Sequence, residues 1–323
     1  MISQSMINQK SADVLSMVIK HPSFNDAYQL IREAYHFKLQ TGLAQNYLVV
    51  GSSGTGKTHL SEFLGKEFPA TENTDGINIP LLVVEIPSKP TIKNLAEEML
   101  VQLGDPLYYR GSAIQKTTRI LQLIRACQIK LIIFDEMHHF VDQVNKKAPA
   151  EVADWLKSLI NKAQVSTVLM GLEQTQTILD INEQLRRRFC RRIDLKPFDL
   201  NCSASRSQFL GVIKKIDEAL ALPSPLDLQQ ESIARQLHFA TYGLMGYIVK
   251  LMLGAFHIAR SRNLPGIDRQ CLEQGFSDYV WVEGVGKLNP FNPQFIGERL
   301  DKRGMIFYKP SALEVIINKG KKL

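Results

Sequence analysis

A glycine-rich segment at residues 51–58 has the residue types and spacing needed to hold a phosphate group. It follows an apolar stretch at residues 47–50 and precedes a helix-like stretch at residues 58–68. Glycines let backbone N–H groups curl around an anion, and the start of the next helix adds its positive end. The segment matches the P-loop pattern G-x-x-x-x-G-K-[ST] in its strand–loop–helix context. Its residues are Gly51, Ser52, Ser53, Gly54, Thr55, Gly56, Lys57 and Thr58.

Two side chains of this loop are expected to act on the phosphates. In a P-loop the lysine reaches the β- and γ-phosphates of a nucleoside triphosphate, and the following hydroxyl binds Mg²⁺. These residues are Lys57 and Thr58 here. The sequence therefore predicts binding of ATP with Mg²⁺.

An apolar run at residues 131–134 ends in two acids, Asp135 and Glu136. Such a run is typical of a buried parallel strand. Asp135 is suited to holding the hydrated Mg²⁺, and Glu136 to orienting and polarising an attacking water. The pair indicates hydrolysis of the triphosphate. His138 and His139 follow, and we expect no joint metal site because adjacent helical residues do not share a face; they are either γ-phosphate sensors or surface residues.

The elements expected around these residues alternate between strands and helices. Strands are predicted at 46–50, 80–86, 130–135, 165–170 and 192–195, with helices at 58–68, 92–103, 114–128 and 150–163. This alternation is typical of an α/β fold with a parallel sheet sandwiched by helices. Ligands bind at the C-terminal edge of such sheets, where Gly51 and Asp135 both fall.

The chain is expected to divide into four parts. Residues 1–45 form a helical extension, 46–200 the nucleotide-binding α/β domain, 201–283 an all-α lid and 284–323 a C-terminal tail. The lid helices are predicted at 203–220, 226–239, 244–260 and 268–280. Within the tail, residues 289–293 resemble a linker and residues 319–323 form a basic end.

Composition indicates a soluble protein with a polyanionic partner. Hydrophobic residues make up 45% and charged residues 22% of the 323 residues, which is ordinary for a globular chain. Four widely spaced cysteines suggest free thiols in a reducing cytoplasm. We expect no signal peptide, no membrane span and a cytoplasmic location. The net charge of +7 favours a polyanion as partner.

Five arginines lie among residues 186–192, between the fourth and fifth predicted strands. They could form a basic loop or a nucleic-acid patch. This position is also where ring-forming ATPases present an arginine finger, which stabilises charge on the phosphoryl group bound by a neighbouring subunit. We expect Arg187 or Arg188 to act in this way.

The motifs in their order resemble AAA+ ATPases with a helical lid. The strings GSSGTGKT, IIFDEMHH, VLMGLEQTQTIL, QLRRRF and YGLMGYI together are similar to the TniB/TnsC family of bacterial transposition regulators, over roughly residues 25–280. The resemblance implies binding of double-stranded DNA with ATP. It also implies assembly with copies of itself into rings or helical filaments, hexameric or heptameric per turn. Such proteins couple target-selection proteins to the transposase.

Two departures from the AAA+ pattern predict slow, partner-stimulated hydrolysis. Residues 168–171, at the end of the fourth strand, are apolar where a polar sensor is usual, and Glu173 and Gln174 are the first polar candidates. Near Gly246 in the lid, Tyr247 and Lys250 stand where a sensor arginine is common.

Two small, polar and basic segments, residues 88–93 and 110–119, are candidates for contact with DNA phosphates. In the resembling family, related segments line the central channel. The alternative is that they are solvated helix caps and surface charge. No side-chain pattern suggests base reading, so we expect sequence-tolerant binding. The residues selected are Lys89, Lys93, Lys116, Thr117 and Arg119.

Two other functions stay open from the sequence. A helicase-loader or initiator-type AAA+ ATPase shares every nucleotide-binding feature, and a stable complex with a helicase would favour it. A protein-remodelling ATPase in signalling or secretion would oligomerise without DNA, although the basic charge argues mildly against it.

Overall fold

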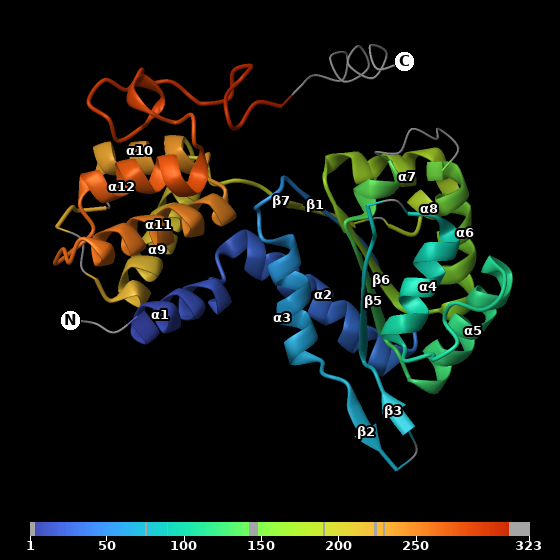
Figure 1. The fold of residues 1–323 in the computed structure, drawn as a ribbon. Helices are drawn as coiled ribbons and strands as arrows, with labels where there is room; N and C mark the ends of the chain where they lie inside the picture. The colour runs from blue at the N-terminus through green and yellow to red at the C-terminus, as the bar shows by residue number, and fades with distance from the viewer. Residues whose placement is uncertain are drawn as a thin grey trace. The chain divides into compact units, whose positions relative to one another are not determined.

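The computed structural model describes residues 4–74, 76–88, 90–141, 148–189, 191–222, 225–228 and 230–309. The chain divides into two compact units (Figure 1). Pro22–Lys196 forms one, called the α/β unit below. The other, called the helical unit, joins Met1–His21 to Pro197–Leu323. The predicted extension at residues 1–45 is therefore divided between the two units.

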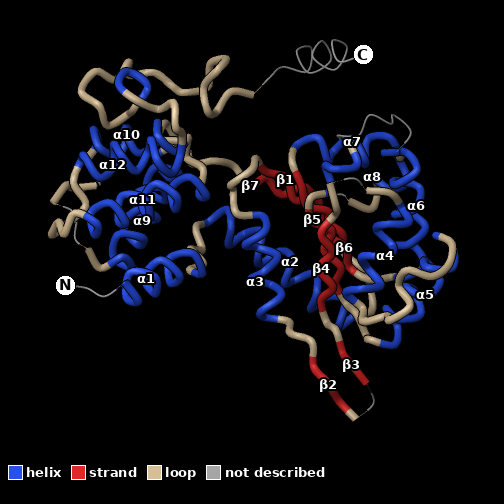
Figure 2. Tube along the Cα trace, viewed as in Figure 1, coloured by secondary structure: helices blue, strands red, loops and turns tan. Residues whose placement is uncertain are grey.

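The α/β unit is built on a five-stranded parallel sheet (Figure 2). The strands, in chain order, are β1 (Asn46–Gly51), β4 (Leu81–Glu85), β5 (Leu131–Asp135), β6 (Ser166–Gly171) and β7 (Arg191–Leu195). They lie in the order β4-β5-β6-β1-β7, and every neighbouring pair is parallel. All five predicted strands are confirmed. A short antiparallel hairpin of β2 (Thr71–Asn73) and β3 (Gly76–Asn78) was not predicted.

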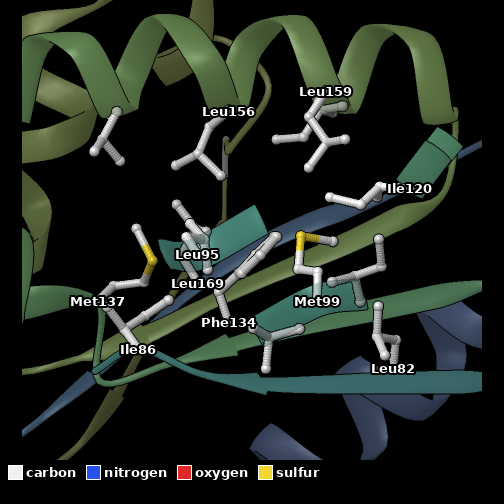
Figure 3. Close-up of a cluster of buried hydrophobic side chains, with 14 of the residues drawn as sticks. Leu82, Ile86, Leu95, Met99, Ile120, Phe134, Met137, Leu156, Leu159 and Leu169 are labelled. Carbon is white, nitrogen blue, oxygen red and sulfur yellow. The ribbon is translucent and has the colours of Figure 1, made fainter. Parts of the chain in front are cut away.

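Helices cover both faces of this sheet, as expected for its buried apolar strands. On one face lie α2 (Pro22–Thr41) and α3 (Lys57–Glu67); on the other lie α4 (Ile92–Gln102), α5 (Ala113–Ala126) and α6 (Ala148–Ala163) (Figure 2). Figure 3 shows how α6 contributes to the core, because Leu156 and Leu159 point toward the sheet above Phe134 and Met99. Two short helices, α7 (Gln176–Ile181) and α8 (Glu183–Arg186), precede β7.

The helical unit contains α9 (Ser203–Leu220), α10 (Glu231–Thr241), α11 (Met245–Ser261) and α12 (Arg269–Gly275), which continues into a π-helical turn, Phe276–Val280. The four predicted lid helices are therefore present, although α10 begins later than expected. The N-terminal helix α1 (Gln4–Ser16) packs against α9 and α11 and buries Val14 in their core.

The segment after α12 differs from the linker expected at residues 289–293. Phe291 and Leu300 are completely buried in the core of the helical unit. The Asn289 side chain donates hydrogen bonds to the carbonyl oxygens of Glu273 and Gly284. This segment is folded because two large apolar side chains leave water, a gain of about 1.5–3 kcal/mol each. The basic end at residues 319–323 lies outside the described residues.

In the described part of the chain, none of the individual helices combines the length and apolar character required to cross a membrane. Only α10 and α11 taken together meet that test, and the two are bent by 111°.

Candidate nucleotide-binding site

The P-loop runs from the end of β1 to the start of α3. Gly54 and Gly56 have φ angles of 81° and 95°, a left-handed conformation that glycine adopts without steric penalty. Gly51 is needed for another reason. A Cβ there would lie 2.6 Å from the carbonyl oxygen of Leu195 and 2.6 Å from Oγ1 of Thr55. The glycines therefore set both the curl of the loop and its close packing against β7.

Lys57 lies inside this loop rather than on the surface. Its side chain is buried, and its Nζ donates to the carbonyl oxygens of Gly51 (2.9 Å) and Ser52 (3.2 Å). Thr55 Oγ1 donates to the same Ser52 oxygen at 2.8 Å. Burial lowers the pKa of Lys57, and the negative charges of Glu136 and Asp135 partly oppose that shift. The ammonium group is thus close to both acids of the predicted site.

Asp135 ends β5 and is buried, with 3% of its surface exposed. Its Oδ1 accepts a hydrogen bond from the Glu136 backbone N–H at 2.8 Å, and its Oδ2 accepts one from Ser61 Oγ at 3.5 Å. Burial raises the pKa of Asp135, while that N–H and the Lys57 charge act in the opposite direction. A buried carboxylate beside hydroxyl groups on α3 offers the hard oxygen ligands that Mg²⁺ prefers. The Asp135 carboxylate and the Ser61 hydroxyl fit a magnesium ion, and Ser61 was not singled out from the sequence. Thr58, the predicted ligand, is exposed in the first turn of the same helix.

Glu136 and the two histidines lie close together just after β5. Glu136 is left-handed, with φ 58°, and the next residues form a 3-10 helix, Met137–Phe140. His138 Nδ1 lies 3.2 Å from Glu136 Oε2, and the rings of His138 and His139 have centroids 4.5 Å apart. The expectation of no joint metal site assumed a regular α-helix, whereas the histidines lie on a 3-10 helix; it therefore loses that argument but stays a prediction.

The short 3-10 helix after β6, Glu173–Thr175, contains a buried polar residue that the sequence analysis missed. Thr175 is completely buried, and its hydroxyl oxygen forms no hydrogen bond with the described residues. An ideal Cβ on Gly171 would lie 2.2 Å from Thr175 Oγ1 and 3.4 Å from His138 Nδ1. Glu173, named from the sequence, instead pairs with Arg192 at 2.6 Å. Thr175 is therefore a better candidate than Glu173 for sensing the state of the site.

The arginine-rich segment presents its candidate residues to solvent. Arg187 and Arg188 are both exposed just after α8. Arg187 pairs with Glu183 at 2.6 Å across one helical turn, with both side chains largely exposed. Such a surface pair contributes less than about 1 kcal/mol and is easily exchanged for another partner.

The residues selected for DNA contact have different structural roles. Lys116 is completely buried, pairs with Glu97 at 3.1 Å and donates to the Tyr108 carbonyl oxygen. Lys116 is therefore not available to a DNA phosphate, and its prediction as a DNA contact is wrong. The side chain lies on the inner face of α5 and holds the loop that precedes this helix.

Two further candidates are also held by contacts within the protein. Arg119 pairs with Asp105 at 3.4 Å and donates to the carbonyl oxygens of Leu107 and Arg110. Thr117 accepts a hydrogen bond from Trp155 Nε1. Lys93 is exposed in the first turn of α4, and Lys89 lies outside the described residues.

Comparison with known families decides where this chain belongs. The family described as Bacterial TniB protein matches residues 16–199, more than half of the chain. The chain belongs to this family. The TniB match spans the P-loop, the acidic pair after β5 and the arginine-rich segment. No significant match is found among curated proteins.

Solved structures with a similar fold are AAA+ proteins, which agrees with the TniB assignment. Cdc6p from Pyrobaculum aerophilum has a TM-score of 0.63 at 12% identity, covering 88% of this chain and 73% of that one. The Aeropyrum pernix ORC1 protein in complex with DNA has a TM-score of 0.60 at 14% identity, covering 82% and 66%. The Aeropyrum pernix ORC2 protein gives 0.58 at 13%, covering 79% and 67%. At these identities the likeness establishes the AAA+ α/β fold.

Proposed function

We propose that this TniB-family chain is an ATPase that binds duplex DNA in an ATP-dependent, sequence-tolerant way. It would oligomerise on DNA and couple target-site selection to recruitment of a transposase. The observation that carries the proposal is the position of Lys57 inside the P-loop, close to Asp135 and Glu136. Family membership supports the link to transposition.

The residues of the site would divide the chemistry among them. Lys57 would exchange its carbonyl partners for the β- and γ-phosphates, since an ammonium binds a phosphate oxygen more strongly than a neutral carbonyl. Thr58 and Asp135 would hold Mg²⁺, which neutralises phosphate charge when bound. Glu136 would orient the attacking water from its position at the end of β5.

Oligomerisation would complete this site with a residue from a neighbouring copy. Arg187 and Arg188 are both exposed, as a finger that reaches the phosphates of a neighbouring subunit must be. We expect Arg188→Ala or Arg187→Ala to remove most ATPase activity, with Arg186→Ala as the matched control.

A mixing experiment tests whether the arginine acts between subunits. Lys57→Ala protein retains the finger but cannot bind the phosphates, whereas Arg188→Ala protein has the reverse defect. A mixture of the two should regain ATPase activity if the guanidinium is supplied in trans. Unchanged activity of both single arginine variants at every protein concentration would contradict the proposal.

DNA binding would use phosphate contacts rather than base contacts. Lys93 is the best supported of the candidate residues, because it is exposed near the capped start of α4. Lys89, Thr117 and Arg119 stay proposals. The fold is compatible with this role, since ORC1 was solved with DNA. Electrostatic binding predicts that the logarithm of affinity falls linearly with the logarithm of salt concentration.

The decisive experiment is fluorescence anisotropy of labelled duplex DNA with ATP, a non-hydrolysable analogue, ADP or no nucleotide. We expect tight binding only with the two triphosphate forms, and loss of that binding in Lys57→Ala. Glu136→Gln should bind DNA with ATP as the wild type does, because it removes the general base and not the phosphate contacts. Equal binding in all four states would reject the ATP-dependent mechanism and favour a protein-remodelling ATPase.

A further inference from the structure

We infer that Glu136, His138 and His139 form a binding site for a divalent transition metal such as Zn²⁺, distinct from the Mg²⁺ site at Asp135 and Thr58. One ligand atom from each of the three residues lies within 4.8 Å of the others. No other group of three His, Cys, Asp or Glu side chains meets this condition among the residues that the structure describes. Two imidazoles and one carboxylate are a ligand set that zinc accepts in proteins.

The backbone brings these ligands together. Glu136 has a φ of 58°, which is uncommon for a residue other than glycine and involves strain that is often found at functional sites. This left-handed residue directly follows β5 and precedes the 3-10 helix that carries both histidines. As a result, Glu136 Oε2 lies 3.2 Å from His138 Nδ1.

The turn that carries both histidines is anchored on each side. Met137 and Phe140 are completely buried in the core beneath the sheet edge, so the 3-10 helix between them is fixed by packing. His138 is buried and His139 half-buried, with ring centroids 4.5 Å apart. Gly171 leaves room for the backbone of this turn, since a Cβ there would lie 3.1 Å from the backbone nitrogen of His138. Ligands held on a rigid turn favour metal binding because little conformational entropy is lost when the ion binds.

The distances require only a small adjustment. Zinc binds nitrogen and carboxylate oxygen at about 2.0–2.2 Å in a tetrahedral arrangement, so two of its ligands lie about 3.3–3.6 Å apart. The present ligand atoms lie within 4.8 Å of one another, and side-chain rotations that move their tips by up to about 1.5 Å would close this spacing. The nitrogen ligands also separate this site from the oxygen-rich Mg²⁺ position, because imidazole suits zinc, cobalt and nickel, whereas Mg²⁺ favours oxygen.

Metal binding here would inhibit the enzyme. This consequence rests on the proposed function, in which Glu136 polarises the attacking water. A carboxylate coordinated to Zn²⁺ is a much weaker proton acceptor, because the charge of the metal withdraws electron density from both of its oxygens, and its orientation toward the water would be lost. ATP binding through Lys57 would persist, so zinc would hold the protein in its triphosphate-bound state.

The first test measures metal binding without nucleotide, on the full chain freed of metal with a chelator. Isothermal titration with Zn²⁺ and visible absorption with Co²⁺ should give one ion per chain. Removing an outer-sphere partner typically reduces metal affinity 10–100-fold. We therefore expect His138→Ala and His139→Ala each to lose at least about 100-fold, with Glu136→Gln weakened and His36→Ala on α2 unchanged.

Folding of the variants is checked by a separate measurement. Zn²⁺ should raise the melting temperature of the wild type and of His36→Ala, but not that of a folded His139→Ala. Absence of a bound ion, or equal affinity in wild type, His138→Ala and His139→Ala, would overturn the site.

The second test measures ATPase activity with Mg²⁺ present while Zn²⁺ is added and then removed by chelation. We expect reversible inhibition with an apparent constant that matches the affinity measured without nucleotide. A protein without any ATPase activity would refute the proposed function and leave the binding result intact. Zinc that binds to these residues without affecting hydrolysis would refute the inhibitory role alone.

Discussion

The P-loop edge of the sheet and the α4–α5 region both contain a buried lysine that the sequence marks as functional, yet the two lysines differ in their surroundings. Lys57 contacts only loop carbonyl oxygens and lies near two acids that form no ion pair with it among the described contacts. Lys116 is paired with Glu97 and with the Tyr108 carbonyl oxygen. The first can exchange its partners for a ligand, whereas the second holds its own loop in place. A buried lysine therefore indicates a binding role only when a ligand can take the place of its partners within the protein.

The largest expected effect is that of Lys57→Ala on catalysis. Losing one charged donor to a transferring phosphoryl group should lower ATP hydrolysis by at least about 100-fold. Burial lowers the pKa of Lys57, so the charged form is less favourable in the folded protein than in water, and we expect Lys57→Ala not to lower the free energy of unfolding. Steady-state ATPase assays and urea unfolding measure the two effects. Lys66→Ala, at the end of the same helix, is the control. A large loss of stability in Lys57→Ala would show that Lys57, like Lys116, supports the structure of its own loop.

Lys116→Ala should give the opposite result. It leaves the Glu97 carboxylate and the Tyr108 carbonyl oxygen without their partner, and we expect a loss of about 2–4 kcal/mol in the free energy of unfolding. DNA affinity per folded molecule should stay unchanged. Arg125→Ala, exposed on the same helix, should alter stability by less than about 0.5 kcal/mol. Weaker DNA binding by folded Lys116→Ala protein would return this residue to the DNA surface.

His21 in the helical unit is also a buried ionisable residue, but it lies in a region for which no chemistry is predicted. His21 is buried against the Phe198 ring, and burial lowers its pKa from 6.5 to about 4. The unfolded chain therefore takes up the proton first, so the stabilisation is complete above pH 6.5 and is lost as pH falls toward 4. We expect His21→Phe to reduce the loss of stability between pH 7 and pH 4.5 by about 2–3 kcal/mol.

The measurement is urea unfolding of the wild type and His21→Phe at both pH values. Val14→Ala removes a buried side chain of the same unit without removing a proton site. It should lower stability equally at pH 7 and pH 4.5. A pH dependence in His21→Phe as steep as that of the wild type would show that His21 is protonated freely in the folded protein.

The smallest expected effect is that of Lys93→Ala. One lost phosphate contact should weaken DNA binding with ATP by a few-fold and reduce the slope of log affinity against log salt by about 1. Stability should not change, since Lys93 is exposed. Lys162→Ala, exposed at the end of α6, serves as the control in anisotropy titrations at several salt concentrations. If the slope of log affinity against log salt is unchanged in Lys93→Ala, Lys93 makes no phosphate contact. The α4–α5 region would then have no assigned DNA contact.

The strands and the P-loop could be predicted because their signals are local. Four consecutive apolar residues before Gly51 and before Asp135 fit only a buried strand at that length, and the glycine spacing fits a loop around an anion. The β2–β3 hairpin escaped prediction because it has only three residues on each strand and faces solvent. The fold of residues 284–309 also escaped, since the burial of Phe291 and Leu300 depends on helices that are distant in the sequence.

Sequence alone was enough to predict the AAA+ sheet, the phosphate-binding loop and the acidic pair, because each depends on residues adjacent along the chain. The folded structure was needed to learn which charged side chains already have partners within the protein. Lys116 is buried by its pairing with α4, α1 lies with the lid helices, and the left-handed Glu136 brings its carboxylate to His138. Burial and partner choice depend on segments that meet only when the chain folds, and a backbone conformation such as that of Glu136 is held by the packing around it.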